Sequence, residues 1–359
     1  MKRGFTLIEL VFVIVVLGII SMFGADLYTK IYKSYVHVRA VNQLEARTQN
    51  AMMLITNRLE DRIKSSTIGR ELSSNEFVPI SDLTDPRYDI LEWIGQSVES
   101  RNINQRNPGW SGFMSMSQLK DSTWTAGEQD AGYIANTRAA FNMVSLGSDF
   151  PQVANIVGNL RATAYNTPSN NTQVAVIFKV VTNDASPTSV GIGFGYDRAV
   201  KADGSNRVLI AVGTPSNAGS GNIQGETIRI NQYPLNPNND NSQEFSEQYY
   251  IAHSAYAIVP DLGGRDSIVY TRDNDGNVLS KNFDLVLKYN YRPWSTVAGD
   301  AHSYNNNNTG SALLAEDVSL FRFKDDNGAV ALKLCMRDDG RNFDPSELDL
   351  NVCKAQVVY

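Results

Sequence analysis

The chain opens with an apolar run from Phe5 to Ala25 that is interrupted only by Thr6, Glu9 and Ser21. At about 1.5 Å per residue, a helix over this run would span roughly 31 Å, which matches the hydrocarbon core of a bilayer. A cleaved secretory signal is the alternative, but it predicts a run of only 7–15 apolar residues that ends at a small-residue cleavage site. Because this run is longer and continues into further helical pattern, the sequence predicts a retained membrane-spanning helix.

Apolar residues then recur every three or four positions from Leu27 to Ile63, in ten steps over 36 residues. The mean period of 3.6 is that of an α-helix with one apolar face. Charged side chains lie between the apolar ones and form the solvated side. The sequence therefore predicts that a membrane-spanning half, residues 5–25, runs without a break into an amphipathic half, residues 26–68, which ends near Ser66–Gly69. An apolar face of this length must pack on a domain of the same chain or on neighbouring helices.

The basic pair Lys2-Arg3 followed by Gly4-Phe5-Thr6-Leu7-Ile8-Glu9 resembles the leader of type IV prepilins and type II secretion pseudopilins. The resemblance implies that a prepilin peptidase removes residues 1–4 by cutting after Gly4, and that the new amino terminus, Phe5, is methylated. It further implies a single-pass subunit of the bacterial inner membrane with its head in the periplasm. Such subunits later leave the membrane lipid and assemble, through an inner-membrane platform, with other minor and major pilins or pseudopilins. One departure is Asp26, near the position where many major pilins have a proline and a kink.

Glu9 has two interpretations. Thr6 and Glu9 match the capping-box pattern, which satisfies free backbone N–H groups at the start of a helix. A carboxylate inside an apolar span is also costly and normally has a partner. The resemblance supplies that partner as the α-ammonium of Phe5 on a neighbouring subunit, so Glu9 and Phe5 are the expected assembly residues. The two roles are compatible, one in the membrane and one in the filament.

Beyond the stem, the pattern predicts an α+β fold in which the long helix packs on an antiparallel-rich β-sheet head. Residues 69–165 give mixed signals and are expected to be an insertion or subdomain, with short helices over Tyr88–Ser100 and after Pro151, where Asp149 lies near the start. Residues 166–359 predict the β-rich, pilin-like head, because β-branched and apolar runs alternate with turn signals such as Asn327-Gly328. The expected strands are Val174–Val181, Arg207–Val212, Thr227–Ile230, Tyr249–Val259, Asp266–Thr271, Phe283–Tyr291, Val318–Phe323, Ala329–Leu334 and Leu348–Val358.

The segment from Leu313 to Phe323 and the hairpin strand that follows it resemble the head of J-type minor pseudopilins and W-type minor pilins. Cys335 and Cys353 lie in two consecutive expected strands with 17 residues between them. A periplasmic head permits a disulfide between them, and many pilins have one near their C-terminus. Two buried free thiols are the alternative.

Little in the remaining sequence points to catalysis or to a cofactor. Three histidines and no nucleophile–base pattern leave no set of residues for an enzyme. The net charge of −6 argues against bulk nucleic-acid binding, which needs massed Lys and Arg. No cofactor is expected, and the one open metal hypothesis is calcium at an acidic cluster near the C-terminus. Its candidate ligands are Asp338, Asp339, Asp344 and Asp349.

Together these features predict a minor pilin or pseudopilin that assembles into, or primes, a type IV pilus or a type II secretion pseudopilus. A pilus-tip adhesin, a DNA-uptake pilin and a major filament subunit are the alternatives. The sequence leaves the machine open among secretion, motility, adhesion and DNA uptake.

Overall fold

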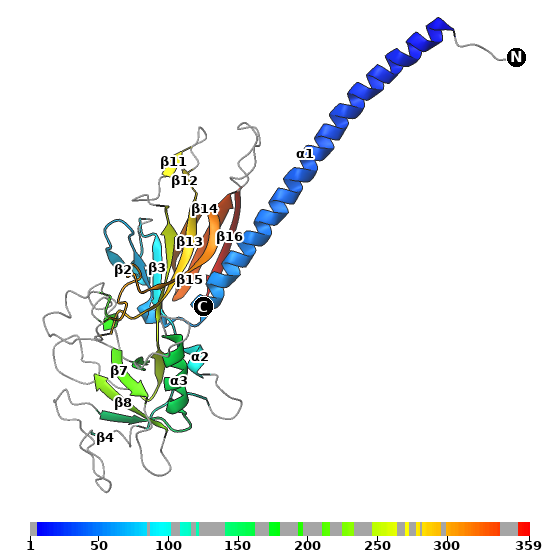
Figure 1. Ribbon diagram of the computed structural model, residues 1–359. Coiled ribbons are helices and arrows are strands. Elements are labelled where there is room, and N and C mark those ends of the chain that lie inside the picture. Colours follow the sequence, from blue (N-terminus) through cyan, green and yellow to red (C-terminus); the bar gives the residue numbers. More distant parts are fainter. Residues whose placement is uncertain are drawn as a thin grey trace.

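The computed structural model describes residues 6–84, 87–101, 108–115, 120–121, 141–161, 172–179, 193–196, 210–215, 225–232, 246–263, 270–272, 278–280, 282–295, 299–337 and 351–359. A long helix, α1 (Leu7–Glu60), projects from a head built on two β-sheets (Figure 1). The predicted α+β class, with a long helix on an antiparallel-rich head, is confirmed.

The stem helix ends earlier than the apolar period suggested. α1 stops at Glu60, and a 3-10 turn (Lys64–Ser66) then leads into β1 (Ile68–Arg70), so the predicted end near Ser66–Gly69 is wrong. Ile63, expected on the helix, donates its backbone N–H to the carbonyl of Ile94 at 2.8 Å. Sheet partners therefore replace the intrahelical hydrogen bonds at this point, while Ile63 remains buried.

An eight-stranded antiparallel sheet holds the inner half of the stem, in the order β16-β15-β14-β13-β10-β3-β1-β2. The first strands of the head, β1 and β2, and its last strand, β16, lie at opposite edges of this one sheet. The strands after β1 are β2 (Phe77–Pro79), β3 (Ile90–Ile94), β10 (Ala255–Asp261), β13 (Phe283–Tyr291), β14 (Gly310–Asp326), β15 (Ala329–Arg337) and β16 (Asn351–Val358).

A second sheet of six strands, in the order β4-β5-β8-β7-β6-β9, lies at the end of the head away from the N-terminus of the stem (Figure 1). It comprises β4 (Lys120–Asp121), β5 (Phe141–Val144), β6 (Val174–Phe178), β7 (Ile210–Pro215), β8 (Thr227–Gln232) and β9 (Tyr249–Ala252). Residues 69–165, expected to be one insertion or subdomain, contribute strands to both sheets, and the sheets do not divide at residue 165. A separate pair, β11 (Tyr270–Arg272) and β12 (Val278–Ser280), completes the strands of the described residues.

Two expected helices had opposite outcomes. The helix after Pro151 is confirmed as α3 (Phe150–Leu160), which the Asp149 side chain caps by accepting from the N–H of Gln152. The helix over Tyr88–Ser100 is wrong: this stretch forms β3 and then the single turn α2 (Val98–Arg101). Every residue of β3 is buried, so the strand lacks the alternation that separates a strand from a short helix in sequence.

The predicted strand bounds are confirmed where the pairing between strands agrees with the apolar and turn pattern of the sequence. Phe283–Tyr291 is β13 with the expected bounds, and Asn327-Gly328 forms the two-residue turn between β14 and β15, with φ of 53° and 83°. Positive φ at both positions is what such a hairpin turn requires. The expected strand Tyr249–Val259 divides at His253-Ser254 into β9 and β10, which belong to different sheets.

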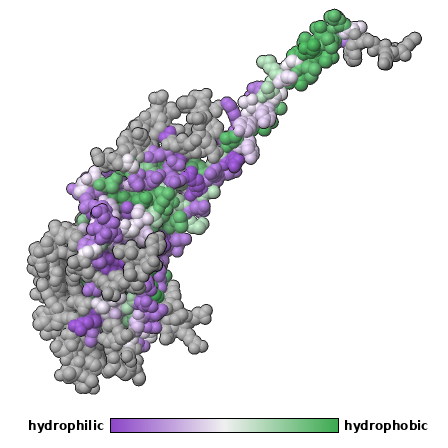
Figure 2. Space-filling view, viewed as in Figure 1, coloured by the Kyte–Doolittle hydropathy of each residue, from purple (hydrophilic) through white to green (hydrophobic). Residues whose placement is uncertain are grey.

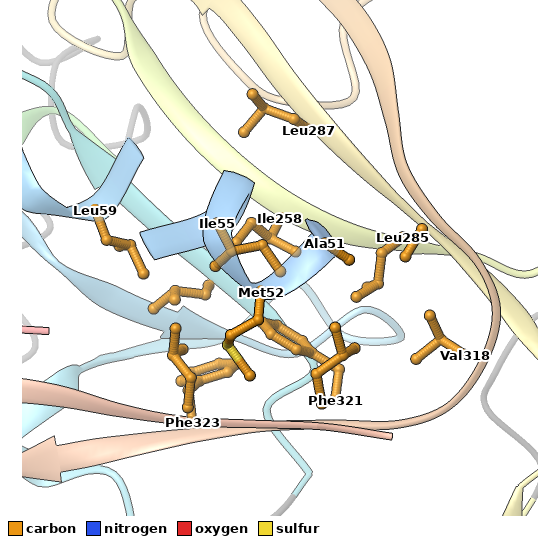
Figure 3. Close-up of a cluster of buried hydrophobic side chains, with 14 of the residues drawn as sticks. Ala51, Met52, Ile55, Leu59, Ile258, Leu285, Leu287, Val318, Phe321 and Phe323 are labelled. Atoms are coloured by element: carbon orange, nitrogen blue, oxygen red, sulfur yellow. The ribbon is translucent and has the colours of Figure 1, made fainter. Parts of the chain in front are cut away.

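In the described part of the chain, three apolar cores lie between successive layers of the fold. The first lies between α1 and the eight-stranded sheet, where Met52 and Ile55 meet Phe321 and Ile258 (Figure 3). A second core joins the other face of that sheet to the six-stranded sheet, and a third packs α3 on the far face of the six-stranded sheet. The order of layers is therefore stem, first sheet, second sheet, α3.

Candidate functional site

Among the residues that the structure describes, none covers the outer half of α1. The first buried residue of the helix is Ala40, and residues 7–39, about 50 Å of helix, project beyond the head. Large apolar side chains stand exposed along this length, with Phe12 and Phe23 each 72 % exposed. Figure 2 shows hydrophobic residues gathered at this outer end. By length and composition α1 is able to cross a bilayer, and its apolar window contains no buried residue.

The start of the helix explains part of the role of Glu9. Its Oε2 accepts the backbone N–H of Thr6 at 3.3 Å and the Thr6 hydroxyl at 3.1 Å. The Glu9 carboxylate thus satisfies a free donor at the helix N-terminus, where the helix dipole favours an anion. The cleavage and methylation residues, Gly4 and Phe5, lie outside the described residues, so the intersubunit role of Glu9 stays a prediction.

The apolar run ends at an ion pair on the same helix. Lys30 Nζ lies 3.0 Å from Asp26 Oδ2, one turn away, and Tyr28 stacks on Tyr32 with ring centroids 6.4 Å apart. The helix continues through Asp26 without a break. The charged and aromatic residues follow the apolar segment directly, as is typical where a helix leaves the hydrocarbon core.

Side chains of the head contact the inner half of α1 along its length. Leu44, Met52 and Leu59 are buried against the first sheet. At the rim, Lys354 of β16 donates to Glu45 at 2.7 Å, and this contact lowers the pKa of the Glu45 carboxyl. Arg47, two residues further along the helix, reaches Glu316 of β14 at 3.2 Å. The head therefore encloses an apolar face and pairs the charges beside it.

Arg62 ties the end of the stem to the C-terminus. Its guanidinium donates to the carbonyls of Leu59 at 2.9 Å and Val358 at 3.0 Å, and also reaches those of Gly328 and Tyr359. Burial lowers the pKa of Arg62. Sequence reasoning missed this residue, because three of its four acceptors, the carbonyls of Gly328, Val358 and Tyr359, lie more than 260 residues away and leave no signal near the helix end.

A disulfide joins Cys335 and Cys353, which face each other in the register of β15 and β16. No free cysteine remains. The bond links the edge strand β16, which contacts α1, to the strand beside it. The docking surface for the stem therefore has a covalent brace.

The histidines and the acidic residues considered for chemistry have different positions in the structure. His253 is buried where the two sheets meet, with its Nδ1 2.8 Å from the Ser97 hydroxyl, and burial lowers its pKa to about 4. The Nδ1 of His302 lies 3.3 Å from the Arg292 carbonyl. In the part of the chain that is described, no three His, Cys, Asp or Glu side chains group as metal ligands. The calcium candidates Asp338, Asp339, Asp344 and Asp349 lie outside that part.

Buried ion pairs between elements were also missed by sequence reasoning. Arg70 donates to Glu92 at 2.8 Å, and the Tyr291 hydroxyl donates to the second oxygen of Glu92. Near the joint of the two sheets, Asp300 accepts from Arg161 at 2.8 Å and lies 3.3 Å from Arg292. Arg70 pairs with Glu92, whereas Arg161 and Arg292 share the carboxylate of Asp300. These groups act in packing, and their pairing depends on tertiary contacts that leave no local pattern.

Comparison with known proteins gives one match. The family model described as the prokaryotic N-terminal methylation motif matches residues 1–25. No curated protein and no solved structure matches the chain. The matched segment is the leader and the start of the uncovered half of α1.

Proposed function

Because the chain carries the N-terminal methylation motif of prepilins and pseudopilins, we propose that it is a minor subunit of a type IV pilus or a type II secretion pseudopilus. A prepilin peptidase removes residues 1–4 and methylates Phe5. The stem then anchors the subunit in the bacterial inner membrane, with the head in the periplasm, until it joins other pilins or pseudopilins through the inner-membrane assembly platform. The proposal contains no catalytic step and no cofactor.

The observation that carries this proposal is the continuity of the leader with a helix that the head leaves uncovered. Residues 7–39 expose an apolar surface that water does not favour, so they need lipid or other helices around them. Before assembly, membrane lipid would surround this surface. After assembly, the stems of neighbouring subunits would surround it. The same surface thus serves both states without a change in the head.

The size of the head favours a minor subunit. The described part of residues 61–359 contains two large sheets in successive layers, and the six-stranded sheet extends the head away from the stem (Figure 1). Such a head fits poorly in a tightly repeating shaft and more easily at a filament tip, where it primes assembly. The resemblance of the last strands to J-type pseudopilins and W-type pilins points the same way. A major subunit is the alternative, and its abundance in sheared fibres relative to other pilin-like proteins separates the two.

Glu9 and Phe5 form the proposed contact between subunits. In the single chain, one oxygen of the Glu9 carboxylate, Oε2, accepts from the backbone N–H and the hydroxyl of Thr6. The other oxygen, Oε1, takes no part in these two hydrogen bonds. In a bundle of stems it meets the α-ammonium of Phe5 on a neighbour, and each charge then has a partner in the apolar interior.

One observation favours the adhesin alternative: the six-stranded sheet is the part of the head most distant from the outer half of the stem (Figure 1). A ligand-binding surface there would remain accessible at a filament tip. Deleting strands of this sheet should then abolish adherence while filaments still form. DNA uptake stays the less favoured alternative because the net charge is −6.

N-terminal mass analysis of the membrane-bound protein, made with and without a prepilin peptidase, tests the proposal directly. The expected mature chain begins at methylated Phe5 only when the peptidase is present. A mature chain that begins elsewhere, or one recovered from the soluble fraction, would overturn it.

A further inference from the structure

A cleft of about 360 Å³ opens where the edge strand β9 of the six-stranded sheet meets the end of α2. The residues Trp110–Phe113 line it, together with Lys179, which directly follows β6. Its volume lies at the low end of the range found for ligand pockets, about 300–1,000 Å³. The site described on the stem has no part in this cleft.

Arg101 is held in a defined orientation at the cleft. Its guanidinium carbon lies 4.8 Å from the centroid of the Trp110 ring. Trp110 is only 1 % exposed, and its Nε1–H donates to the Ser97 carbonyl and the Ser100 hydroxyl, each at 3.2 Å. A guanidinium stacked on a fixed ring keeps its edge N–H groups directed outward, ready to donate to an acceptor as a planar fork.

Lys179 supplies a second cation to the lining of the cleft. Its Nζ lies 5.8 Å from the centroid of the Tyr250 ring, and its backbone N–H donates to the Gln248 carbonyl at 2.9 Å. Both side chains are exposed, and within the described ranges neither Arg101 nor Lys179 forms an ion pair with a carboxylate. The two cations therefore differ from Arg70, Arg161 and Arg292, whose carboxylate partners lie within the fold.

The rest of the lining is neutral and mixed. Phe113 presents an aromatic ring that is 56 % exposed, although it lies in a folded segment. The side chains of Gln96, Gln248 and Ser111 add amide and hydroxyl groups. The Tyr249 and Trp110 ring centroids lie 6.1 Å apart, and the Tyr249 hydroxyl lies 2.6 Å from that of Ser145. These contacts fix the position of the Tyr249 side chain.

We propose that this cleft binds a sugar that carries a carboxylate, such as a uronic acid or a sialic acid of a surface polysaccharide. The carboxylate pairs with the Arg101 fork and the Lys179 ammonium. The apolar face of the sugar ring lies on the exposed aromatic surface, and the amide and hydroxyl side chains receive its hydroxyl groups. Nucleic acid fits less well, because it needs a track of cations and the chain offers two here against a net charge of −6.

The inference is independent of how the stem is processed, since it depends on the cleft alone. Under the tip-adhesin alternative it names the class of ligand. Binding is measured on the purified full chain in detergent, so its failure leaves the assembly proposal untouched, and a failure of N-terminal processing leaves the cleft untouched.

The test measures the affinity of the full chain for short oligomers of galacturonate, glucuronate and sialic acid by calorimetry, with neutral galactose oligomers and a glutamate peptide alongside. At least one acidic sugar should bind tenfold or more tightly than the neutral sugars and the peptide, and its affinity should fall as salt rises. R101Q should weaken binding at least tenfold, and K179Q by a smaller factor. R101K, which keeps the charge but loses the fork, should lie between R101Q and the parent.

The matched control is R229Q, which removes an exposed arginine from β8, three strands and about 14 Å along the sheet from β9. It should leave the affinity unchanged, and circular dichroism of each variant checks that the fold is intact. The proposal is overturned if no acidic sugar binds, if R101Q binds as the parent does, or if R229Q weakens binding as much as R101Q. Equal or tighter binding of the glutamate peptide would also overturn it and assign the cleft to acidic peptides.

Discussion

Both halves of α1 carry large apolar side chains, but the two halves have different surroundings. From Ala40 to Leu59 the apolar face is enclosed by the eight-stranded sheet, and exposed charges pair with β14 and β16. From Leu7 to Val38 the large apolar side chains are left exposed by the described part of the head. One continuous helix thus lies in two environments. The extent of the head determines where the buried part of the helix ends and the exposed part begins. Changes in the outer half should alter membrane retention and assembly, whereas changes in the inner half should alter the stability of the head.

The largest effect is expected in the outer half, at Glu9. E9L should leave cleavage and membrane retention unchanged while incorporation into filaments falls at least tenfold. The reason is that an ammonium left unpaired in an apolar interior costs about 3–5 kcal/mol. Quantifying the subunit in sheared fibres and in membranes checks this, with E45Q as an exposed acid of the inner half for comparison. Full incorporation of E9L would remove the proposed role of Glu9.

The inner half responds through the stability of the head. I55A should lower the free energy of unfolding by about 2–5 kcal/mol, because Ile55 is buried at the centre of the first core (Figure 3). Denaturant unfolding followed by tryptophan fluorescence reports this, since Trp93 lies in the same core. The matched variant I14A, in the exposed outer half, should leave the transition where it is. Equal shifts for both variants would contradict the division of the helix.

Acid should weaken the head and leave the stem anchored. Burial lowers the pKa of His253 to about 4 from its ordinary value of 6.5, with Arg292, Arg161 and Arg58 lowering it further and Glu99 opposing them. Between these two values the unfolded chain binds the proton, so stability is highest above pH 6.5 and falls as the pH drops toward 4, by about 3 kcal/mol at most. H253Q should flatten this slope between pH 6.5 and 5 in unfolding experiments. An unchanged slope in H253Q would assign the acid sensitivity to other groups.

Removing the disulfide should also destabilise the head alone. The double variant C335S/C353S should lose about 3 kcal/mol of unfolding free energy, given the 18-residue separation of the two cysteines. Thermal unfolding with and without a reductant measures the loss, and reduction should have no effect on the double variant. Retention in the membrane should be the same for both proteins, because the outer stem does not contact this bond.

The smallest effect is expected at the rim of the docked stem. K354M removes the contact with Glu45, which is exposed to solvent, so the unfolding midpoint should hardly move at high salt. A shift as large as that of I55A would mean that charges rather than the apolar face dock the inner half.

Local patterns predicted the parts of the fold that depend on neighbours in sequence. The apolar period predicted a continuous stem, Asp149 predicted the start of α3, and Asn327-Gly328 predicted the hairpin turn. The same reasoning failed at β3, because burial on both faces removes the alternation of a strand. It also missed Arg62, whose acceptors come from distant parts of the chain.

The sequence by itself determined the leader, the length of the apolar run and the helical period, since each depends on residues within a few positions of one another. The tertiary structure alone decided that cover begins at Ala40, that β9 and β10 separate into two sheets, and that Arg101 and Lys179 stay without carboxylate partners in the described fold. Burial and charge pairing are set by residues brought together from far along the chain, and no local pattern records which of them will meet.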